Sequence, residues 1–278
     1  MDLNEIQRIA AFDDDGRGGN PAGVWIGATL PRAAEMARIA HAVGFSETAF
    51  AAPEGEAWRV RYFSPESEVP FCGHATIALG AALARAHGDG RYALALNAAR
   101  ITVEGRSDGE RVHAALQSPP TRSKAAAAAL VDAALALFGY TRADLDPRIA
   151  PALAHGGADH LVLALSSRAL LAAMRYDLDA GRALMLEHGL VTVVLAWAER
   201  PQLFHTRNPF ASGGVYEDPA TGAGTAALAG YLRDIGWPHG GRIEIVQGED
   251  MRARSRLTAE IGEEAGGSIR VSGTVRLM

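Results

Sequence analysis

One glutamate within an apolar stretch is the first candidate for proton chemistry in this sequence. Glu47 lies between Phe45 on one side and Ala49 and Phe50 on the other. Water stabilises the charged form of a carboxyl group less in such surroundings, which suits the group to taking up a proton and returning it. The alternative is a well-solvated glutamate at the edge of a strand.

An internal repeat supplies two further candidate sites. Residues 68–83 read EVPFCGHATIALGAAL, and residues 217–232 read EDPATGAGTAALAGYL. Without gaps they share the pattern E-x-P-x-x-G-x-x-T-x-A-L-x-x-x-L, which favours duplication over chance similarity. In each copy proline ends a strand, glycine permits a turn, and the small residues and leucines that follow predict a buried helix.

The starts of these two helices are candidate anion-binding sites. The backbone N–H groups of a first helical turn lack partners within the helix, and the small residues at Gly73 and Gly222 leave them open. His74 follows Gly73, where the positive end of the helix dipole favours a neutral imidazole. Asp218 precedes a proline and could orient an amine or hydroxyl group, or simply cap the turn. Two core helices with ordinary caps are the alternative.

The composition is that of an ordinary globular protein. The 278 residues carry a formal net charge of −5, and 48% of them are hydrophobic. Cores tend to divide near this length, so two domains are expected. Acidic and basic residues are interspersed and the longest apolar tract, 125–138, is short, so neither nucleic acid nor a membrane is expected as a partner.

Cysteine and lysine usage bears on cofactors and location. Cys72 is the only cysteine, which excludes a disulfide within the chain and a structural zinc site built from thiolates. The first ten residues do not resemble a secretory signal, so a cytoplasmic location is expected. Lys124 is the only lysine and adjoins an alanine-rich stretch, which argues against a Schiff base with pyridoxal phosphate.

Other cofactor and metal motifs are weak. The G-x-G-x-x-A pattern at 222–227 does not follow an apolar strand, as a dinucleotide site requires, and neither a P-loop nor a G-x-S-x-G motif occurs. His155, Asp159 and His160 are metal-ligand types, but a glycine-rich loop explains them better. Neither a cofactor nor a metal site is therefore expected.

Short strands and a few helices make up the remainder, which indicates the α+β class. Residues 118–123 contain two prolines and are the best linker candidate. The expected domains are 1–118 and 119–267, with a last strand at about 268–278 that packs back on the first domain. Strands are expected at 6–12, 23–27, 47–52, 58–64, 92–96, 101–104, 111–117, 160–165, 191–198, 243–246 and 268–277, and further helices at 31–43, 125–138 and 180–187.

Four motifs, in order along the chain, resemble the PhzF-like (phenazine biosynthesis) family. They are GGNPAG at 18–23, FSETAF at 45–50, VPFCGHAT at 69–76 and EDPATG at 217–222. The resemblance covers essentially the whole chain and implies the fold of diaminopimelate epimerase. That fold has two pseudo-symmetric domains, each a mostly antiparallel, barrel-like sheet around a central helix, with the active site in the cleft. The resemblance also implies a homodimer.

The resemblance assigns roles to residues of these motifs. It implies a cofactor-independent isomerase that moves a proton between carbons of a small carboxylate-bearing substrate, with Glu47 as the acid/base and His74 and Asp218 as further catalytic residues. The substrate-binding residues expected in the same motifs are Asn20, Ser46, Cys72, Gly73, Thr76, Gly222 and Ala223.

Two positions distinguish this chain from related patterns. Epimerases of this fold use two opposed cysteines, whereas the repeat here pairs Cys72 with Thr221, whose hydroxyl is far too weak an acid for that role. A single carboxylate that moves a proton on one face of the substrate remains. The family often has serine where this chain has Ala223, so a pocket hydroxyl is missing. A non-catalytic small-anion-binding or regulatory protein on the same fold is therefore the alternative function.

Overall fold

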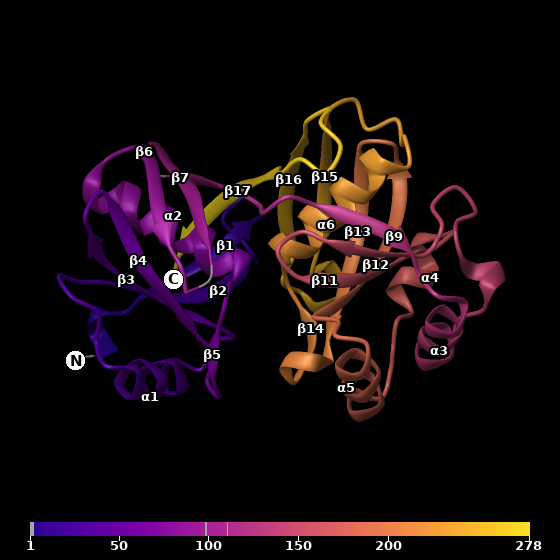
Figure 1. Ribbon diagram of the computed structural model, residues 1–278, viewed down its shortest axis with the longest axis horizontal. Helices are drawn as coiled ribbons and strands as arrows, with labels where there is room; N and C mark the ends of the chain where they lie inside the picture. The colour runs from indigo at the N-terminus through magenta and orange to yellow at the C-terminus, as the bar shows by residue number, and fades with distance from the viewer. Residues whose placement is uncertain (1–2, 98, 110) are drawn as a thin grey trace. The chain divides into compact units, whose positions relative to one another are not determined.

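The computed structural model describes residues 3–97, 99–109 and 111–278. The chain divides into two compact units, here called unit 1 (Met1–Gln117 and Ser272–Met278) and unit 2 (Ser118–Val271). Strands outnumber helices in both units (Figure 1). The protein therefore has a mixed α+β fold, as expected.

Unit 1 is built on strands that pair mostly antiparallel. The pairs β1–β2, β3–β4, β6–β7 and β7–β8 are antiparallel, whereas β2–β3 and β4–β6 are parallel. Residues 274–277 of β17 (Ile269–Leu277) pair with β1, so the last strand returns to this unit. The strands are β1 (Gln7–Asp13), β2 (Asn20–Ile26), β3 (Thr48–Glu54), β4 (Ala57–Phe63), β5 (Glu68–Val69), β6 (Gly90–Ala95), β7 (Arg100–Asp108) and β8 (Arg111–Gln117).

Helix α2 (Gly73–His87) is the central helix of unit 1 (Figure 1). Its residues 73–84 are all buried, as the run of small apolar residues predicts, and it packs against β1, β2, β3, β6, β7 and β8. Glycine allows the closest of these approaches. A Cβ atom at Gly105 of β7 would lie 2.2 Å from the carbonyl oxygen of Gly80 in α2. The strand can therefore lie directly on the helix backbone.

Helix α1 (Ala33–Val43) covers another face of the unit 1 sheet. Its buried residues pack against the aromatic rings of Trp25, Phe50 and Phe63. The helix ends at Gly44, whose φ of 73° is in the left-handed region that glycine adopts readily. The strand β3, which carries Phe50, is therefore held between two helices.

Unit 2 has the same kinds of element. The pairs β9–β10, β10–β11, β12–β13 and β15–β16 are antiparallel, and β11–β12 and β13–β15 are parallel. Its strands are β9 (Arg122–Ala125), β10 (Ala152–His155), β11 (Asp159–Ala164), β12 (Thr192–Arg200), β13 (Leu203–Phe210), β14 (Val215–Asp218), β15 (Arg242–Gln247) and β16 (Ser255–Ile261), and its helices are α3 (Ala128–Phe138), α4 (Arg168–Ala172), α5 (Leu178–Glu187) and α6 (Gly222–Asp234).

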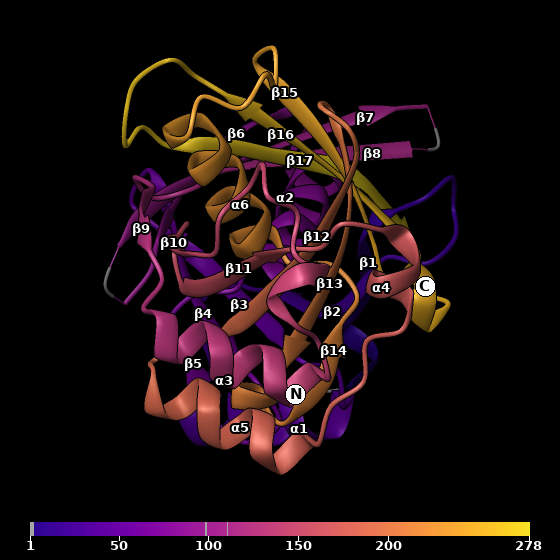
Figure 2. The same ribbon diagram turned by 90° about the vertical axis from the view of Figure 1, so that its right-hand side faces the viewer.

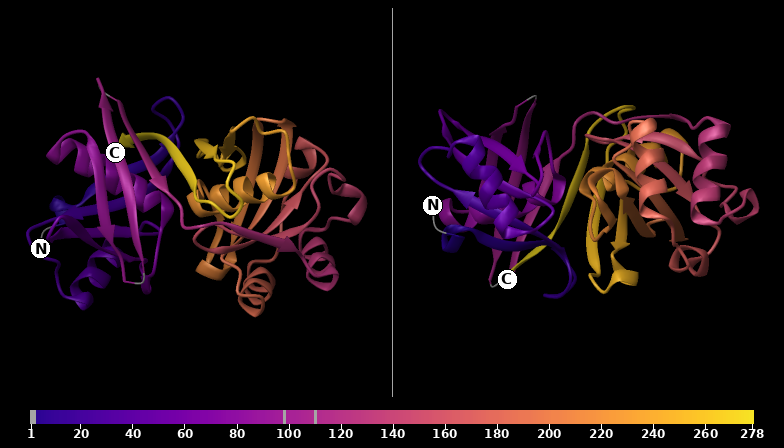
Figure 3. Two further views of the ribbon diagram at one scale, coloured as in Figure 1. Left: turned by 45° about the horizontal axis from the view of Figure 1, so that its top comes forward. Right: turned by 90° about the horizontal axis from the view of Figure 1, so that it is seen from below.

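Strands β11 and β12 are buried on both faces, which explains their nearly continuous apolar sequence. Leu161, Leu163 and Leu195 belong to the core formed with α3, α4 and α5. Helices α3 and α5 lie side by side (Figure 2). Helix α6 also packs against β11 and β12, as well as β9, β10 and β16, and Figure 3 shows it from two further directions. No helix among the described residues is long and apolar enough to cross a membrane.

The structure corrects two boundaries expected from sequence. The helix expected over 125–138 begins only at Ala128, because residues 122–125 form β9 and pair with β10. The linker candidate 118–123 therefore ends inside a strand. Strands β13 and β16 were also not expected. Buried polar side chains interrupt the apolar residues of β13, whereas β16 does alternate between buried and more exposed positions and was overlooked.

His155, Asp159 and His160 lie in a β-hairpin, and only the turn between its strands, residues 156–158, is glycine-rich. Nδ1 of His155 lies 2.7 Å from an Asp159 carboxylate oxygen. His160 is fully buried instead, with Nδ1 2.8 Å from the Thr192 hydroxyl. The three side chains therefore do not form one cluster.

The buried imidazole of His160 makes stability depend on pH. Burial lowers its pKa from 6.5 to about 4, so the unfolded chain takes up this proton first as the pH falls. We expect His160 to reduce the free energy of unfolding by about 2 kcal/mol between pH 7 and pH 5. Urea unfolding of His160→Gln at both pH values should lack this decrement relative to the unmodified protein, whereas the same change at the exposed His113 should retain it. An unchanged pH dependence in His160→Gln would contradict the assignment.

Candidate active site

Glu47 occupies a sheltered position rather than an exposed strand edge. It immediately precedes β3, which pairs with β2 on one side and β4 on the other. Its backbone carbonyl accepts a hydrogen bond from the N–H of Gly23 at 3.2 Å. The side chain is 9% exposed. The carboxylate is therefore held inside unit 1.

His74, the second residue of α2, connects Glu47 to two other side chains. Its Nε2 atom lies 3.4 Å from Oε2 of Glu47 and 3.3 Å from the Ser46 hydroxyl. Its Nδ1 atom lies 3.3 Å from Sγ of Cys72, the residue before the helix. Four residues predicted from the sequence thus meet in unit 1, and we call Ser46, Glu47, Cys72 and His74 the Glu47 cluster.

Thr76 and Tyr62 lie next to the Glu47 cluster and hold the first turn of α2. The Thr76 hydroxyl donates to the backbone carbonyl of Cys72 at 2.7 Å, and the Tyr62 hydroxyl donates to Thr76 at 2.7 Å. Burial raises the pKa of Tyr62, so the phenol keeps the proton that it donates. The hydroxyl of Thr76, a residue expected to bind substrate, is therefore hydrogen-bonded within the protein itself.

Asp218 belongs to a separate buried group in unit 2. It ends β14, opposite Asn208 of β13. Its Oδ2 atom accepts a hydrogen bond of 2.5 Å from the hydroxyl of Thr221, the residue that precedes α6. Both side chains are more than 90% buried. The threonine that stands where Cys72 stands in the other repeat is therefore engaged with Asp218.

Gln247 holds this turn and was not predicted from the sequence. Its Nε2 group donates to the backbone carbonyl of Asp218 at 2.7 Å and to the Thr221 hydroxyl at 2.9 Å. Its Oε1 atom accepts from the backbone N–H of Thr221 at 3.1 Å. The side chain reaches the turn from β15 and is 1% exposed. No local sequence pattern links it to Asp218, because the two residues meet only in the folded unit.

We expect Gln247→Leu to lower the free energy of unfolding by about 2 kcal/mol, because it leaves buried groups of Asp218 and Thr221 without hydrogen-bond partners. Urea unfolding measures this loss. Gln202→Leu is the matched control, since Gln202 is exposed and its side-chain amide donates to the carbonyl of Pro238 at the surface. We expect the control to cost at most about 1 kcal/mol. Equal losses in the two variants would show that Gln247 does not hold the turn.

The starts of α2 and α6 have the same local structure. In both α2 and α6 the residue before the helix has an extended backbone and does not cap the helix with its side chain. Gly73 and Gly222 are buried, and Ala223 is half-buried. Asn20, expected to bind substrate, is buried at the start of β2. Each unit thus offers one helix start beside a buried carboxylate.

A bidentate ion pair holds the first residue of each copy of the repeat. Arg61 binds Glu68 through Nε and NH2 at 2.8 and 2.5 Å, and its guanidinium lowers the pKa of that carboxyl group. Arg207 binds Glu217 in the same way, at 2.9 and 2.5 Å. The second pair is far more buried, with side-chain exposures of 8% and 4%. The sequence signal was present, because each glutamate is the first residue of its repeat.

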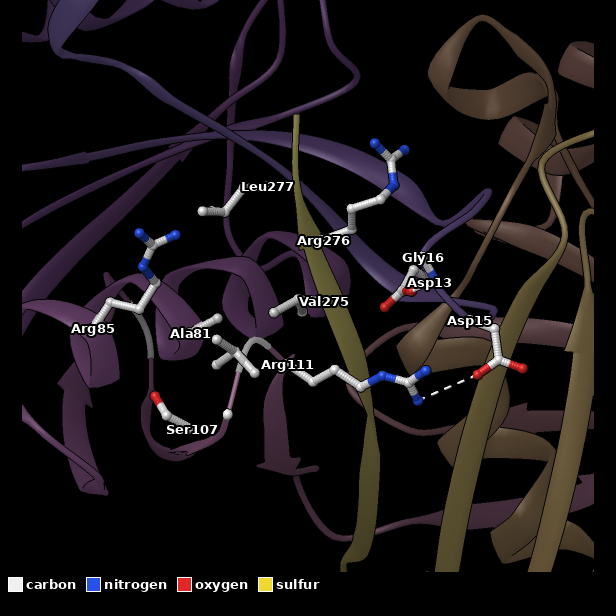
Figure 4. Close-up of a pocket in the computed structure, with 12 residues that line it drawn as sticks. Asp13, Asp15, Gly16, Ala81, Arg85, Ser107, Arg111, Val275, Arg276 and Leu277 are labelled. Atoms are coloured by element: carbon white, nitrogen blue, oxygen red, sulfur yellow. Dashed lines mark hydrogen bonds and ion pairs between the residues drawn. The ribbon is translucent and has the colours of Figure 1, made fainter.

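A hollow of about 510 Å³ in unit 1 is a different feature (Figure 4). Its charged lining includes Asp15, Arg85, Arg111 and Arg276, and none of its lining residues belongs to the Glu47 cluster. Arg111 pairs with Asp15 at 3.2 Å, and both side chains are well exposed. This pair therefore lies in open solvent, unlike the buried groups around Glu47.

Comparison with known proteins gives a consistent result. The family model of phenazine biosynthesis-like proteins matches residues 9–277. The trans-2,3-dihydro-3-hydroxyanthranilate isomerase of Pseudomonas aeruginosa is 33% identical over 95% of this chain and 94% of its own length. An uncharacterised isomerase of Escherichia coli K12 is 28% identical over 99% of this chain and 96% of its own length.

Solved structures show a similar fold. A predicted epimerase of Pseudomonas aeruginosa superposes with a TM-score of 0.85 at 24% identity and covers 98% of this chain and 96% of its own. A hydroxyproline epimerase of Agrobacterium vitis, solved with trans-4-hydroxy-L-proline, gives a TM-score of 0.64 at 13% identity, over 98% and 88% of the two chains. The mixed α+β fold is thus shared with a predicted epimerase and with a hydroxyproline epimerase.

Proposed function

The chain belongs to the phenazine biosynthesis-like family, as its motifs predicted, and from this premise we propose that it is a cofactor-independent isomerase. The proposed reaction moves a proton between carbons of a small carboxylate-bearing metabolite. Two relatives that match nearly the whole chain are named as isomerases, which supports this class of reaction.

Glu47 is the proposed proton carrier, and its buried contact with His74 is the observation that carries the proposal. The carboxylate oxygen takes a proton from a substrate C–H bond and returns it to another carbon on the same face. Such acid/base catalysis contributes about 10²–10⁴ in rate. Nε2 of His74 lies 3.3 Å from the Ser46 hydroxyl and 3.4 Å from the Glu47 carboxylate. These contacts orient the His74 ring, and the ring in turn can hold the carboxylate in place while the proton moves.

The remaining roles follow from the same premise. The open N–H groups at the starts of α2 and α6 suit a substrate carboxylate. Asp218, held by Thr221 and Gln247, is assigned the orientation of a substrate amine or hydroxyl group. A two-thiol mechanism is not part of the proposal, since Thr221 occupies the second cysteine position and donates its hydroxyl to Asp218.

The architecture of the proposed enzyme is pseudo-symmetric and arose by duplication. Three repeated features support this: the shared sequence pattern, a buried helix that begins at the glycine of each copy, and the bidentate Arg–Glu pair ahead of it. A duplicated unit explains the two similar helix starts. The candidate carboxylates themselves are not repeated, because Asp218 aligns with Val69 and Glu47 lies ahead of the first copy.

A non-catalytic anion-binding protein is the second candidate function. The observation that favours it is Ala223, which provides no hydroxyl at a helix start where the family often has serine. Binding through backbone N–H groups does not need that hydroxyl, whereas turnover could.

Solvent deuterium exchange distinguishes the two candidates. The protein is incubated in ²H₂O with trans-2,3-dihydro-3-hydroxyanthranilate and, separately, with a panel of amino-hydroxy acids. The first compound is chosen because one relative is named as its isomerase. We expect deuterium in a substrate or product of at least one compound, detected by NMR. Calorimetric binding of a panel member without exchange or product would instead establish the anion-binding function.

A further inference from the structure

The Glu47 cluster contains three side chains of the types that bind zinc. Glu47, Cys72 and His74 each offer one ligand atom, all within 4.8 Å of one another, and all three residues are buried. In the part of the chain that the structure describes, this is the one group of three or more His, Cys, Asp or Glu residues placed so closely. The single-cysteine argument excludes a site made of several thiolates, but it does not exclude a mixed site.

The distances are near those of a tetrahedral zinc site. Zinc bonds of about 2.0 Å to nitrogen and oxygen and about 2.3 Å to sulfur separate neighbouring ligand atoms by about 3.3–3.5 Å. Here Nε2 of His74 lies 3.4 Å from Oε2 of Glu47 and 3.9 Å from Sγ of Cys72. The thiol must turn about its Cα–Cβ bond toward Nε2, and the Ser46 hydroxyl must release that nitrogen. These are side-chain movements only.

The ligands stand on backbone that does not have to move. Glu47 adjoins the paired strand β3, and Cys72 and His74 lie at the start of a helix surrounded by strands. All three ligands belong to unit 1, so the site is complete within that unit.

We propose that Glu47, Cys72 and His74 form a zinc site with an open fourth position, and that Zn²⁺ bound there inhibits the protein. Three protein ligands plus an exchangeable water are typical of zinc sites that are open to solutes. Zinc would occupy the carboxylate oxygen to which the isomerase proposal gives the proton. The inhibition therefore rests on the proposed function, whereas the binding does not.

Cobalt titration of the metal-free protein, without substrate, tests the binding. Co²⁺ replaces zinc in such sites and gives a thiolate-to-metal absorption band in the near ultraviolet. We expect one Co²⁺ per chain with this band, and its loss on addition of Zn²⁺. Cys72→Ser should abolish the band, and His74→Ala should weaken binding at least about 100-fold. Circular dichroism verifies that both variants remain folded.

His155→Ala is the matched control, because His155 contacts Asp159 on the surface of unit 2 and leaves all three ligands in place. It should bind Co²⁺ as the unmodified protein does. Absence of the thiolate band in the unmodified protein would overturn the proposal. So would Co²⁺ binding by Cys72→Ser and His74→Ala that is as tight as in the unmodified protein. If the band forms but no compound exchanges deuterium, the metal site stands and the isomerase proposal fails. If exchange occurs and the band does not, only the metal site is wrong.

Discussion

Glu47→Gln is expected to reduce deuterium exchange into the substrate by about 10²–10⁴. Glutamine has nearly the same volume and can still contact His74, but its amide cannot accept the proton from carbon. The side chain lies 3.4 Å from His74 and is 9% exposed, so water has little room to replace the missing carboxylate. The rate of exchange into a substrate identified with the unmodified protein, followed by NMR, measures the effect.

The control for this substitution lies at the far end of β3, the strand that Glu47 precedes. Glu54 ends β3 and is exposed, so Glu54→Gln should exchange at the unmodified rate. Equal melting temperatures of the two variants would show that unit 1 stays folded. Full exchange by Glu47→Gln would remove Glu47 from the reaction, whatever the state of its neighbours.

Local patterns predicted the parts of the fold that depend on neighbouring residues. The small apolar runs after Gly73 and Gly222 predicted two buried helices, and both form. Local patterns failed where distant pairing decides the structure. Ala125 belongs to an alanine-rich stretch that favours helix, but pairing with Ala152 of β10 places it in a strand. The backbone hydrogen bonds of that pairing depend on a strand 27 positions later in the chain, which helix propensity does not register.

The candidate site shows the same division. Motifs identified Glu47, His74 and Asp218 as candidates, because each lies in a short segment with recognisable spacing. The groups that hold them were missed. Gln247 reaches Thr221 across 26 residues of sequence, and its role is visible only from its buried hydrogen bonds. Distant contacts also decide what Thr76 does, because its hydroxyl is engaged with Tyr62 and with a backbone carbonyl.

Arg207→Met is expected to lower the free energy of unfolding by about 3–5 kcal/mol, because it leaves the Glu217 carboxylate buried without a cation. The Arg207 guanidinium also donates to the backbone carbonyl of Ala172 at 3.0 Å. Burial opposes its charge, yet the hydrogen bonds and charge of Glu217 keep the pKa of Arg207 raised. Glu217 directly precedes Asp218, so exchange activity should fall as well. Urea unfolding measures the loss of stability.

Two further variants test whether the loss of stability in Arg207→Met comes from burial of the unpaired carboxylate or simply from loss of an ion pair. Arg142→Met breaks the ion pair between Arg142 and Asp132, in which the two side chains are 56% and 60% exposed. It should lower the free energy of unfolding by at most about 1 kcal/mol, because water already solvates both groups. The double variant Arg207→Met, Glu217→Leu removes the stranded charge, so it should be more stable than Arg207→Met alone. If the double variant is no more stable, the loss comes from the carbonyl contacts of Arg207 and not from the unpaired carboxylate.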